Sequence, residues 1–353
     1  MSQNRAKIRC VTYGGPAGWF LRKTMSGLTS RLYLEAQYCL RKRLYKRYMK
    51  HFAQAEAQGT LLMPCLISIE TINRCNSACE FCPANRNAET RPFCRMEEEL
   101  FHKLIRELKE LNYSGYLNLY VNNEPFMDTR IEEWYRYARE QLPFAKMLLY
   151  TNGTLLTLER FTKIIPCIDK MIINNYSDTL KLHKNICRLY KFVRDNKAYW
   201  DKDITIQIRY IREILTNRAG TAPNKRKKKR SRKICIMPFT DITVYPDGRA
   251  GICCNDALEK TNYGNLHEHT LLEIWDSGAY RQLRNALRFG REQYPFCRGC
   301  DFVDAGIRNQ FIKEALCKRQ RQPPENGWNS NCLNGYKTST EENKTNDNTG
   351  KNS

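Results

Sequence analysis

Apolar, strand-like runs alternate with helical stretches from residue 65 to about residue 215, and no other feature limits the possible folds as strongly. The strand-like runs lie at 65–70, 116–121, 146–150, 170–174 and 204–210. The helical stretches lie near 96–112, 129–141, 155–165 and 179–197. Strands that alternate with helices pair in parallel through right-handed crossovers. The pattern therefore predicts an α/β fold with a parallel sheet, built from fewer units than an eightfold barrel.

Three cysteines follow the first strand-like run. Cys75, Cys79 and Cys82 stand in the sequence C-N-S-A-C-E-F-C. Thiolates at this spacing can hold three irons of a cubane [4Fe–4S] cluster and leave the fourth iron without a protein ligand. An open metal position can bind and activate a small molecule, whereas a closed site is usually structural or carries electrons. Zinc usually takes four ligands, and no fourth ligand stands at a natural spacing here.

The composition favours metal binding over disulfides. The 353 residues include sixteen cysteines and five histidines. The basic start is followed by three glycines and a proline between residues 11 and 21, which makes a poor signal peptide. No run approaches the ~20 apolar residues of a membrane-spanning helix. We therefore expect a reduced, cytoplasmic protein in which clustered cysteines bind metal.

The net charge of +22 is concentrated in two segments, residues 1–50 and 225–233. An enzyme that binds nucleic acid more often spreads its positive charge over the catalytic face, so nucleic acid is not an expected partner. We interpret the second segment as part of a solvated linker. Residues 28–57 are predicted to form one amphipathic helix with many lysines and arginines. Two alternatives remain open for it, contact with an anionic membrane surface and docking on the barrel.

The cysteine motif resembles the signature of the radical S-adenosylmethionine (SAM) superfamily, in which an aromatic residue precedes the third cysteine. Phe81 fills that place. The resemblance implies a partial (β/α)6 barrel and a cluster whose open iron is chelated by the amino and carboxylate groups of SAM. It implies that one electron from the cluster cleaves SAM into methionine and a 5′-deoxyadenosyl radical, which abstracts hydrogen from the substrate. It also implies an electron donor of the flavodoxin or ferredoxin type.

Polar motifs follow the later strand-like runs, and ligands of parallel barrels bind at the carboxyl ends of the strands. The segment Asn122-Asn123-Glu124-Pro125 resembles the Gly-Gly-Glu motif of the superfamily, which contacts the amino group of SAM. Asn-Asn replaces Gly-Gly here, but a carboxylate opposite an ammonium is the expected chemistry. The alternative is an ordinary turn between a strand and a helix.

Three further motifs complete the expected SAM site. Thr151-Asn152-Gly153 follows the third run, and Asn174-Asn175-Tyr176 follows the fourth. Asparagines can bind ribose hydroxyls or cap the next helix. Arg209, in preference to Arg212, could pair with the SAM carboxylate or with an anionic substrate. The predicted SAM-binding residues are Phe81, Asn123, Glu124, Asn152, Asn174 and Arg209.

A second group of cysteines comprises Cys235, Cys253, Cys297 and Cys300. A β-hairpin with a Pro-Asp-Gly turn is predicted between the first two, which would bring them together. Four thiolates from two close pairs suit a closed metal site, and spacing alone does not separate zinc from [4Fe–4S]. Cys254 could replace its neighbour as a ligand.

The second group resembles the auxiliary-cluster modules known as SPASM and Twitch. The resemblance rests on the order Cys235, Gly248, Cys253 and on the phrases at 264–266 and 271–275. No cysteine follows Cys300 until Cys317, which implies the shorter Twitch form with one auxiliary [4Fe–4S] cluster. The implied division is an N-terminal region with its helix (1–60), a radical SAM core (61–218), a basic linker (219–234), an auxiliary-cluster domain (235–317) and a disordered tail (318–353).

The resemblance implies a radical SAM oxidoreductase that oxidises an alcohol of a sugar, an aminocyclitol or a related small molecule, with the auxiliary cluster as electron acceptor. The catalytic base is not identified. Three alternatives are weighed against this function. They are a maturase that modifies a peptide or protein, an enzyme acting on a glycan at a membrane, and a non-catalytic metal-binding module.

Overall fold

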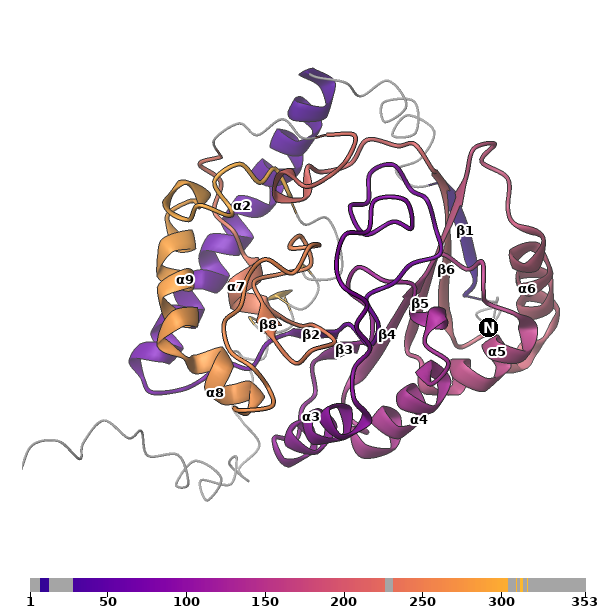
Figure 1. The fold of residues 1–353 in the computed structure, drawn as a ribbon, viewed down its shortest axis with the longest axis horizontal. Coiled ribbons are helices and arrows are strands. Elements are labelled where there is room, and N and C mark those ends of the chain that lie inside the picture. Colours follow the sequence, from indigo (N-terminus) through magenta and orange to yellow (C-terminus); the bar gives the residue numbers. More distant parts are fainter. Residues whose placement is uncertain are drawn as a thin grey trace, which may run out of the picture. The chain divides into compact units, whose positions relative to one another are not determined.

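The computed structural model describes residues 7–12, 28–225, 231–303, 309, 312, 313 and 316. Eight strands form one sheet in the order β1-β6-β5-β4-β3-β2-β7-β8 (Figure 1). The strands are β1 (Arg9–Thr12), β2 (Leu66–Ile69), β3 (Tyr116–Asn118), β4 (Lys146–Thr151), β5 (Lys170–Ser177), β6 (Asp203–Tyr210), β7 (Asp241–Val244) and β8 (Ala250–Gly251). All neighbouring strands are parallel except β7 and β8, which are antiparallel.

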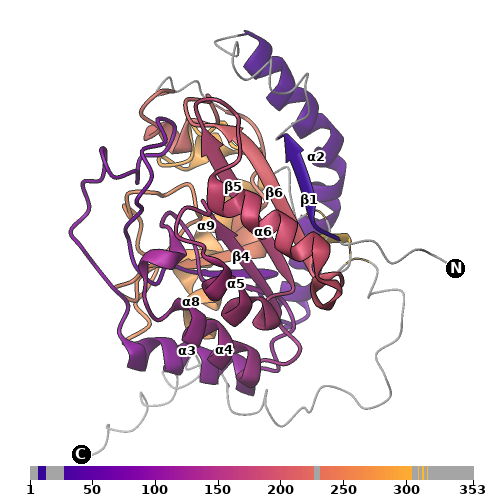
Figure 2. The same cartoon turned by 90° about the vertical axis from the view of Figure 1, so that its right-hand side faces the viewer.

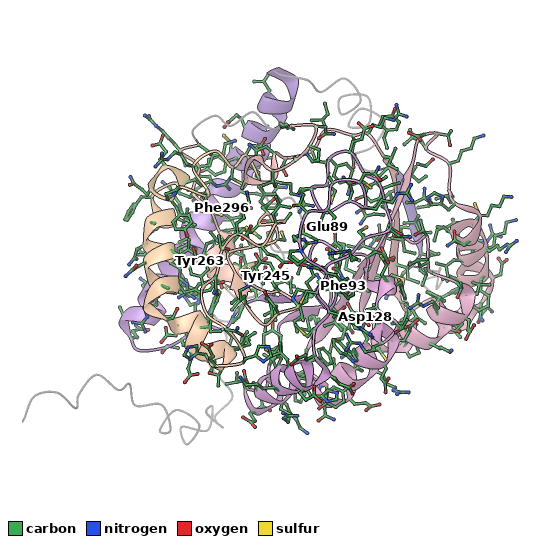
Figure 3. All side chains as sticks on the ribbon, viewed as in Figure 1. Glu89, Phe93, Asp128, Tyr245, Tyr263 and Phe296 are labelled. Atoms are coloured by element: carbon green, nitrogen blue, oxygen red, sulfur yellow. The ribbon has the colours of Figure 1, made fainter. Side chains whose placement is uncertain are left out.

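Four helices alternate with the central strands and cover the outer face of the sheet (Figure 2). They are α3 (Glu98–Glu110), α4 (Ile131–Gln141), α5 (Leu158–Ile164) and α6 (Lys184–Asp195). Their apolar faces are buried, and Phe101 of α3 stacks on Trp134 of α4 at 4.1 Å between ring centroids. Side chains fill the interior between the sheet and the helices (Figure 3). The predicted α/β partial barrel of parallel strands is therefore confirmed.

Two strand pairings in the sheet were not predicted. β1 pairs with β6, and Arg9 forms an ion pair of 2.7 Å with Asp203. β7 pairs in parallel with β2, so the hairpin expected after Cys235 also extends the barrel sheet. Gly248 occupies the hairpin turn with φ +82°, where a side chain would be strained and would meet the Asn265 amide at 2.8 Å.

Helix α2 (Leu28–Ala57) has the predicted bounds. Of the two alternatives for this helix, the structure shows it docked on the rest of the protein. Tyr48 and Phe52 are fully buried. Phe52 contacts the rings of Phe239 and Trp275 edge to face, with centroids 5.5 and 6.4 Å apart. The apolar face that could have met a membrane is thus covered by protein. In the ranges that the structure describes, no helix is long and apolar enough to cross a membrane.

Residues 231–303 add the α-helices α7 (Met237–Thr240), α8 (Leu271–Asp276) and α9 (Gly278–Arg288). The short 3₁₀ helices are η1 (Pro125–Met127), η2 (Ile165–Cys167), η3 (Lys197–Tyr199), η4 (Arg218–Gly220) and η5 (Arg291–Gln293). Residues 1–312 and 313–353 form separate units. The division of the first unit into core, linker and auxiliary domain stays a prediction. The expected disordered tail, Cys317 and residues 226–230 of the linker lie outside the described residues.

Candidate functional site

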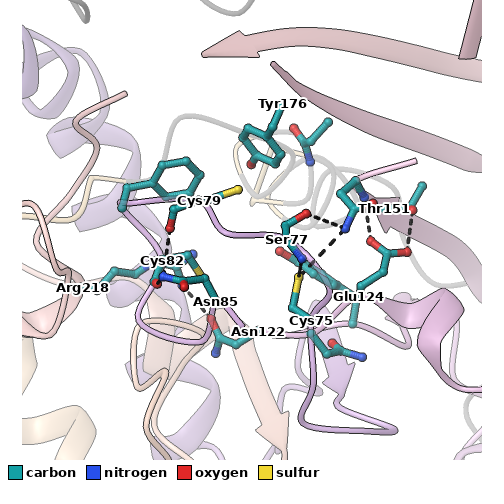
Figure 4. Close-up of a pocket in the computed structure, with 15 residues that line it drawn as sticks. Cys75, Ser77, Cys79, Cys82, Asn85, Asn122, Glu124, Thr151, Tyr176 and Arg218 are labelled. Carbon is teal, nitrogen blue, oxygen red and sulfur yellow. Dashed lines mark hydrogen bonds between the residues drawn. The ribbon is translucent and has the colours of Figure 1, made fainter. Parts of the chain in front are cut away.

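One cavity lies at the carboxyl ends of the central strands and collects most of the predicted site. The thiols of Cys75, Cys79 and Cys82 line it, and Figure 4 shows them between Glu124 on one side and Arg218 on the other. Five of the six predicted SAM-binding residues also line the cavity, namely Phe81, Asn123, Glu124, Asn152 and Asn174. Because the loops after β2, β3 and β4 and the carboxyl-terminal half of β5 supply these residues, the parallel sheet explains their convergence.

The loop that carries the three cysteines is held by its own polar side chains. Asn85, which the sequence analysis did not single out, donates from Nδ2 to the backbone oxygens of Cys79 at 3.1 Å and Cys82 at 2.5 Å. The backbone N–H of Ser77 donates to the sulfur of Cys75 at 3.4 Å. Burial raises the pKa of the Cys75 and Cys79 thiols, so thiolates there need nearby positive charge.

The three thiols could hold a cluster with an open position, because they border a shared cavity. Iron atoms of a cubane would supply the positive charge that these buried thiolates require, and the cavity leaves space beside them for a ligand.

Glu124 is a buried carboxylate oriented by three donors. It accepts hydrogen bonds from the Thr151 hydroxyl at 2.6 Å and the Asn152 backbone N–H at 2.7 Å (Figure 4). It also accepts one from the Phe126 backbone N–H at 3.3 Å. Burial raises its pKa to about 7 against the effect of these donors. The Asn152 amide donates in turn to Ser77 at 2.9 Å. The Thr-Asn-Gly motif therefore joins Glu124 to the cysteine loop.

The structure does not place Arg209 in the cavity wall. Its guanidinium forms an ion pair with the buried carboxylate of Glu213 and lies 5.1 Å from the ring centroid of Tyr176. Its Nη1 donates to Asn174 at 3.3 Å. Arg212 is more than half exposed and forms an ion pair with Asp178 at 3.3 Å. Binding of the SAM carboxylate by Arg209 stays a prediction.

Arg218 supplies a guanidinium to the cavity, and sequence reasoning missed it. Its Nη1 donates to the Asn122 side-chain oxygen at 2.8 Å and to the Cys254 backbone oxygen at 2.9 Å. Arg218 and Ala219 have φ of 48° and 54°, a left-handed backbone that costs free energy for residues with a side chain. Such strain concentrates at functional sites. The only sequence signal was Gly220, in a segment interpreted as linker.

The second group of cysteines also converges. Cys235, Cys253, Cys297 and Cys300 are all buried. Burial raises the pKa of the Cys253 thiol, and the other three thiols of the group raise it further, so the four lie near one another. Cys254 is only partly buried, and its backbone oxygen is the one that Arg218 binds. No cysteine in the described ranges forms a disulfide, as a metal-binding role requires.

The parallel barrel, its open three-thiol cavity and the second group of buried thiols are the arrangement that the resemblance to a radical SAM enzyme with an auxiliary iron–sulfur module implies. The model of the SPASM family, an iron–sulfur cluster-binding domain, matches residues 235–301. The S-adenosyl-L-methionine-dependent 2-deoxy-scyllo-inosamine dehydrogenase of Niallia circulans is 25% identical over 248 residues, which cover 70% of this chain and 96% of that protein.

Solved structures agree on the fold. The crystal structure of BtrN in complex with AdoMet and 2-DOIA is similar to this chain, with a TM-score of 0.60 and 23% identity over 71% of this chain and 98% of that one. An open conformation of BtrN gives a TM-score of 0.51 and 19% identity over the same shares. In its fold and its SPASM-type module the chain is similar to radical SAM enzymes, which bind SAM and [4Fe–4S] clusters.

Proposed function

We propose that this enzyme oxidises an alcohol of a sugar, an aminocyclitol or a related small molecule to a ketone, with a second [4Fe–4S] cluster as electron acceptor. The contact that carries the proposal is the double hydrogen bond of Arg218. Its Nη1 joins Asn122 in the cavity wall to the backbone oxygen of Cys254, the residue after Cys253. A substrate bound at this guanidinium would lie between the two groups of thiols. The function in the name of the Niallia circulans relative supports the same reaction class.

The chemistry explains why two groups of thiols are needed. An alcohol that becomes a ketone loses a hydrogen atom from carbon, a proton from oxygen and one electron. When bound, SAM on the cluster of Cys75, Cys79 and Cys82 supplies hydrogen abstraction, and a cluster on Cys235, Cys253, Cys297 and Cys300 supplies an electron acceptor. A redox-neutral radical reaction would leave the second cluster without this role.

The chain's own residues would orient both reactants. Glu124 offers a carboxylate to the SAM amino group, since a carboxylate and an ammonium form a strong charge-assisted hydrogen bond. Arg218 can donate to a substrate hydroxyl through its remaining N–H groups and favour loss of the hydroxyl proton. The amide nitrogens of Asn122 and Asn123 are buried without hydrogen-bond partners among the described residues. Unpaired buried donors are costly, and a ligand rich in oxygen would satisfy them.

The proposal includes a cytoplasmic location and an electron donor of the flavodoxin or ferredoxin type. Its test uses the enzyme reconstituted anaerobically with iron and sulfide. The protein is mixed with SAM, dithionite and 2-deoxy-scyllo-inosamine or a panel of other aminocyclitols and sugars. We expect one 5′-deoxyadenosine for each ketone formed, and deuterium transfer from the carbinol carbon into 5′-deoxyadenosine by mass spectrometry.

A different product would separate the alternatives. Turnover of a peptide, with no turnover of any polyol in the panel, would replace this proposal with the maturase alternative. Formation of 5′-deoxyadenosine without a ketone would show hydrogen abstraction without oxidation, and would contradict a dehydrogenase.

A further inference from the structure

Arg291 is a buried cation that forms no ion pair with a carboxylate of the described residues. It opens η5 and is 4% exposed. Its Nη1 donates to the backbone oxygen of Cys300 at 2.8 Å, and its Nη2 donates to that of Phe302 at 2.7 Å. Its Nε is buried and has no hydrogen-bond partner within the described ranges. A buried charge costs several kcal/mol unless an opposite charge compensates it, so the environment of this guanidinium needs an explanation.

The four thiols of the second group provide the missing negative charge. Cys235, Cys300, Cys297 and Cys253 raise the pKa of Arg291, whereas burial alone would lower it. The guanidinium contacts the backbone of Cys300 at 2.8 Å and lies close enough to the four thiols for their charge to act on it. Thiols become thiolates when they bind metal, so their charge would be permanent in the loaded protein. The buried Nε–H is one donor that remains available to a group held by these thiolates.

We propose that Arg291 is a positioning residue that raises the reduction potential of the second cluster and so makes it a better acceptor for the electron that the substrate loses. The proposal rests on the proposed function, because the potential matters to the reaction only if that cluster accepts this electron. A cluster on four thiolates is negatively charged and becomes more negative on reduction. A fixed cation beside it stabilises the reduced form more than the oxidised form, and a hydrogen bond to sulfur acts in the same direction.

Another arginine of the same region offers a matched control. Arg288, at the end of α9, forms an ion pair with Glu56 at 3.7 Å and is about a quarter exposed. Arg288→Gln removes the same charge as Arg291→Gln but not from the side of the thiols. Arg291→Lys keeps the charge and removes the two-pronged geometry of the guanidinium.

The test measures the midpoint reduction potential of the second cluster rather than turnover of a substrate. Each variant is built in the full chain with Cys75, Cys79 and Cys82 replaced by alanine, so that only the second cluster remains. Iron and sulfide are quantified, and the midpoint potential is determined by reductive titration followed by electron paramagnetic resonance. We expect Arg291→Gln to lower the equilibrium constant for reduction at least tenfold relative to its parent, a shift of ~59 mV for one electron. Arg291→Lys should shift less, and Arg288→Gln should match the parent.

Equal potentials in Arg291→Gln, Arg288→Gln and the parent would overturn the proposal. If Arg291→Gln loses the cluster while Arg291→Lys keeps it, the positive charge is needed beside the cluster, which supports the pairing. Loss of iron from both Arg291 variants, with Arg288→Gln intact, would assign Arg291 to folding through its two carbonyl contacts and overturn a tuning role. Absence of iron from the parent protein, in which Cys75, Cys79 and Cys82 are replaced by alanine, would also overturn the proposal. Because no substrate is present, failure of the alcohol assay leaves these potentials interpretable.

Discussion

Arg218 donates a 2.9 Å hydrogen bond from Nη1 to the backbone oxygen of Cys254, the residue that follows Cys253. The same nitrogen donates to Asn122 in the cavity wall at 2.8 Å. One side chain therefore joins the cavity of the first cysteine group to the loop of the second. The left-handed backbone at Arg218 and Ala219 holds it in this position at a cost in free energy.

Replacing Arg218 should weaken the binding and turnover of the substrate and leave the binding of SAM almost unchanged. A hydrogen bond from a charged donor is worth about 1.5–3 kcal/mol, so Arg218→Gln should lower substrate-dependent formation of 5′-deoxyadenosine roughly ten- to hundredfold at low substrate concentration. The affinity for SAM should stay within about twofold, because Arg218 contacts Asn122 rather than Glu124. Arg212→Gln is the control, since that guanidinium is 57% exposed. Equal rates in both variants would remove Arg218 from the substrate site.

Cys79→Ala should abolish SAM cleavage, because the first cluster loses one of its three thiolates. Iron content should fall by about four atoms per chain, the content of one [4Fe–4S] cluster. The matched control is Cys187→Ala, because that thiol is free and exposed. Iron analysis and chromatography of 5′-deoxyadenosine check both outcomes. Continued formation of 5′-deoxyadenosine by Cys79→Ala would refute the assignment of the three cysteines.

The central barrel could be predicted because its signals are local. The apolar runs of β2, β3, β4, β5 and β6 and the periodic faces of their helices lie within the sequence of each element. β1 has four residues, and its place beside β6 is decided by a partner almost 200 residues away. β7 was expected in a hairpin, but its pairing with β2 depends on tertiary packing rather than on local pattern.

The residues of the site likewise divide into those that local sequence predicts and those that only the folded structure brings into place. The cysteines, Glu124 and Asn152 stand in short motifs whose spacing reflects their chemistry. Arg218 has no motif, because its role depends on an unusual backbone conformation and on a contact with Cys254, 36 residues further on. Arg209 was chosen for its place on β6, and the sequence contained no sign that Glu213 would pair with it. Pairing of charges across turns is decided by folded geometry.

The affinity for SAM should increase with pH through about 7. Burial raises the pKa of Glu124 to about 7, and only the ionised carboxylate attracts the SAM ammonium. Between pH 8 and pH 6 the ionised fraction falls roughly tenfold, and the dissociation constant should rise by a similar factor. Glu124→Gln should bind SAM weakly, without this dependence. Anaerobic titration calorimetry from pH 6 to pH 8 measures both proteins. A flat wild-type profile would show that Glu124 does not meet the ammonium.

Arg91 is a single buried cation that faces three carboxylates. It contacts Glu89 at 2.8 Å, Glu259 at 2.5 Å and Glu70 at 3.4 Å, and Glu89 is labelled in Figure 3. Glu70 is fully buried at the end of β2, and burial raises its pKa to about 8. Arg249 also forms an ion pair with Glu259, at 3.4 Å. Two guanidiniums cannot neutralise three carboxylates, and Glu70, which lies farthest from Arg91, retains its proton most readily. This network joins the cysteine loop to the C-terminal region through Glu259.

The stability of the protein should therefore decrease with pH in a way that Glu70→Gln removes. The raised pKa means that the folded state binds the Glu70 proton more tightly than the unfolded state. Its contribution to stability is complete below about pH 4.5 and is lost as the pH rises through about 8. Glu70→Gln keeps an acceptor for Arg91 and does not titrate. The melting temperature of the variant, measured relative to that of the wild type, should therefore increase from pH 6 to pH 8.5. Glu80→Gln, at a carboxylate that is 53% exposed, should keep the wild-type profile. Parallel melting curves of wild type and Glu70→Gln, measured anaerobically with the clusters in place, would show that Glu70 is ionised throughout this range.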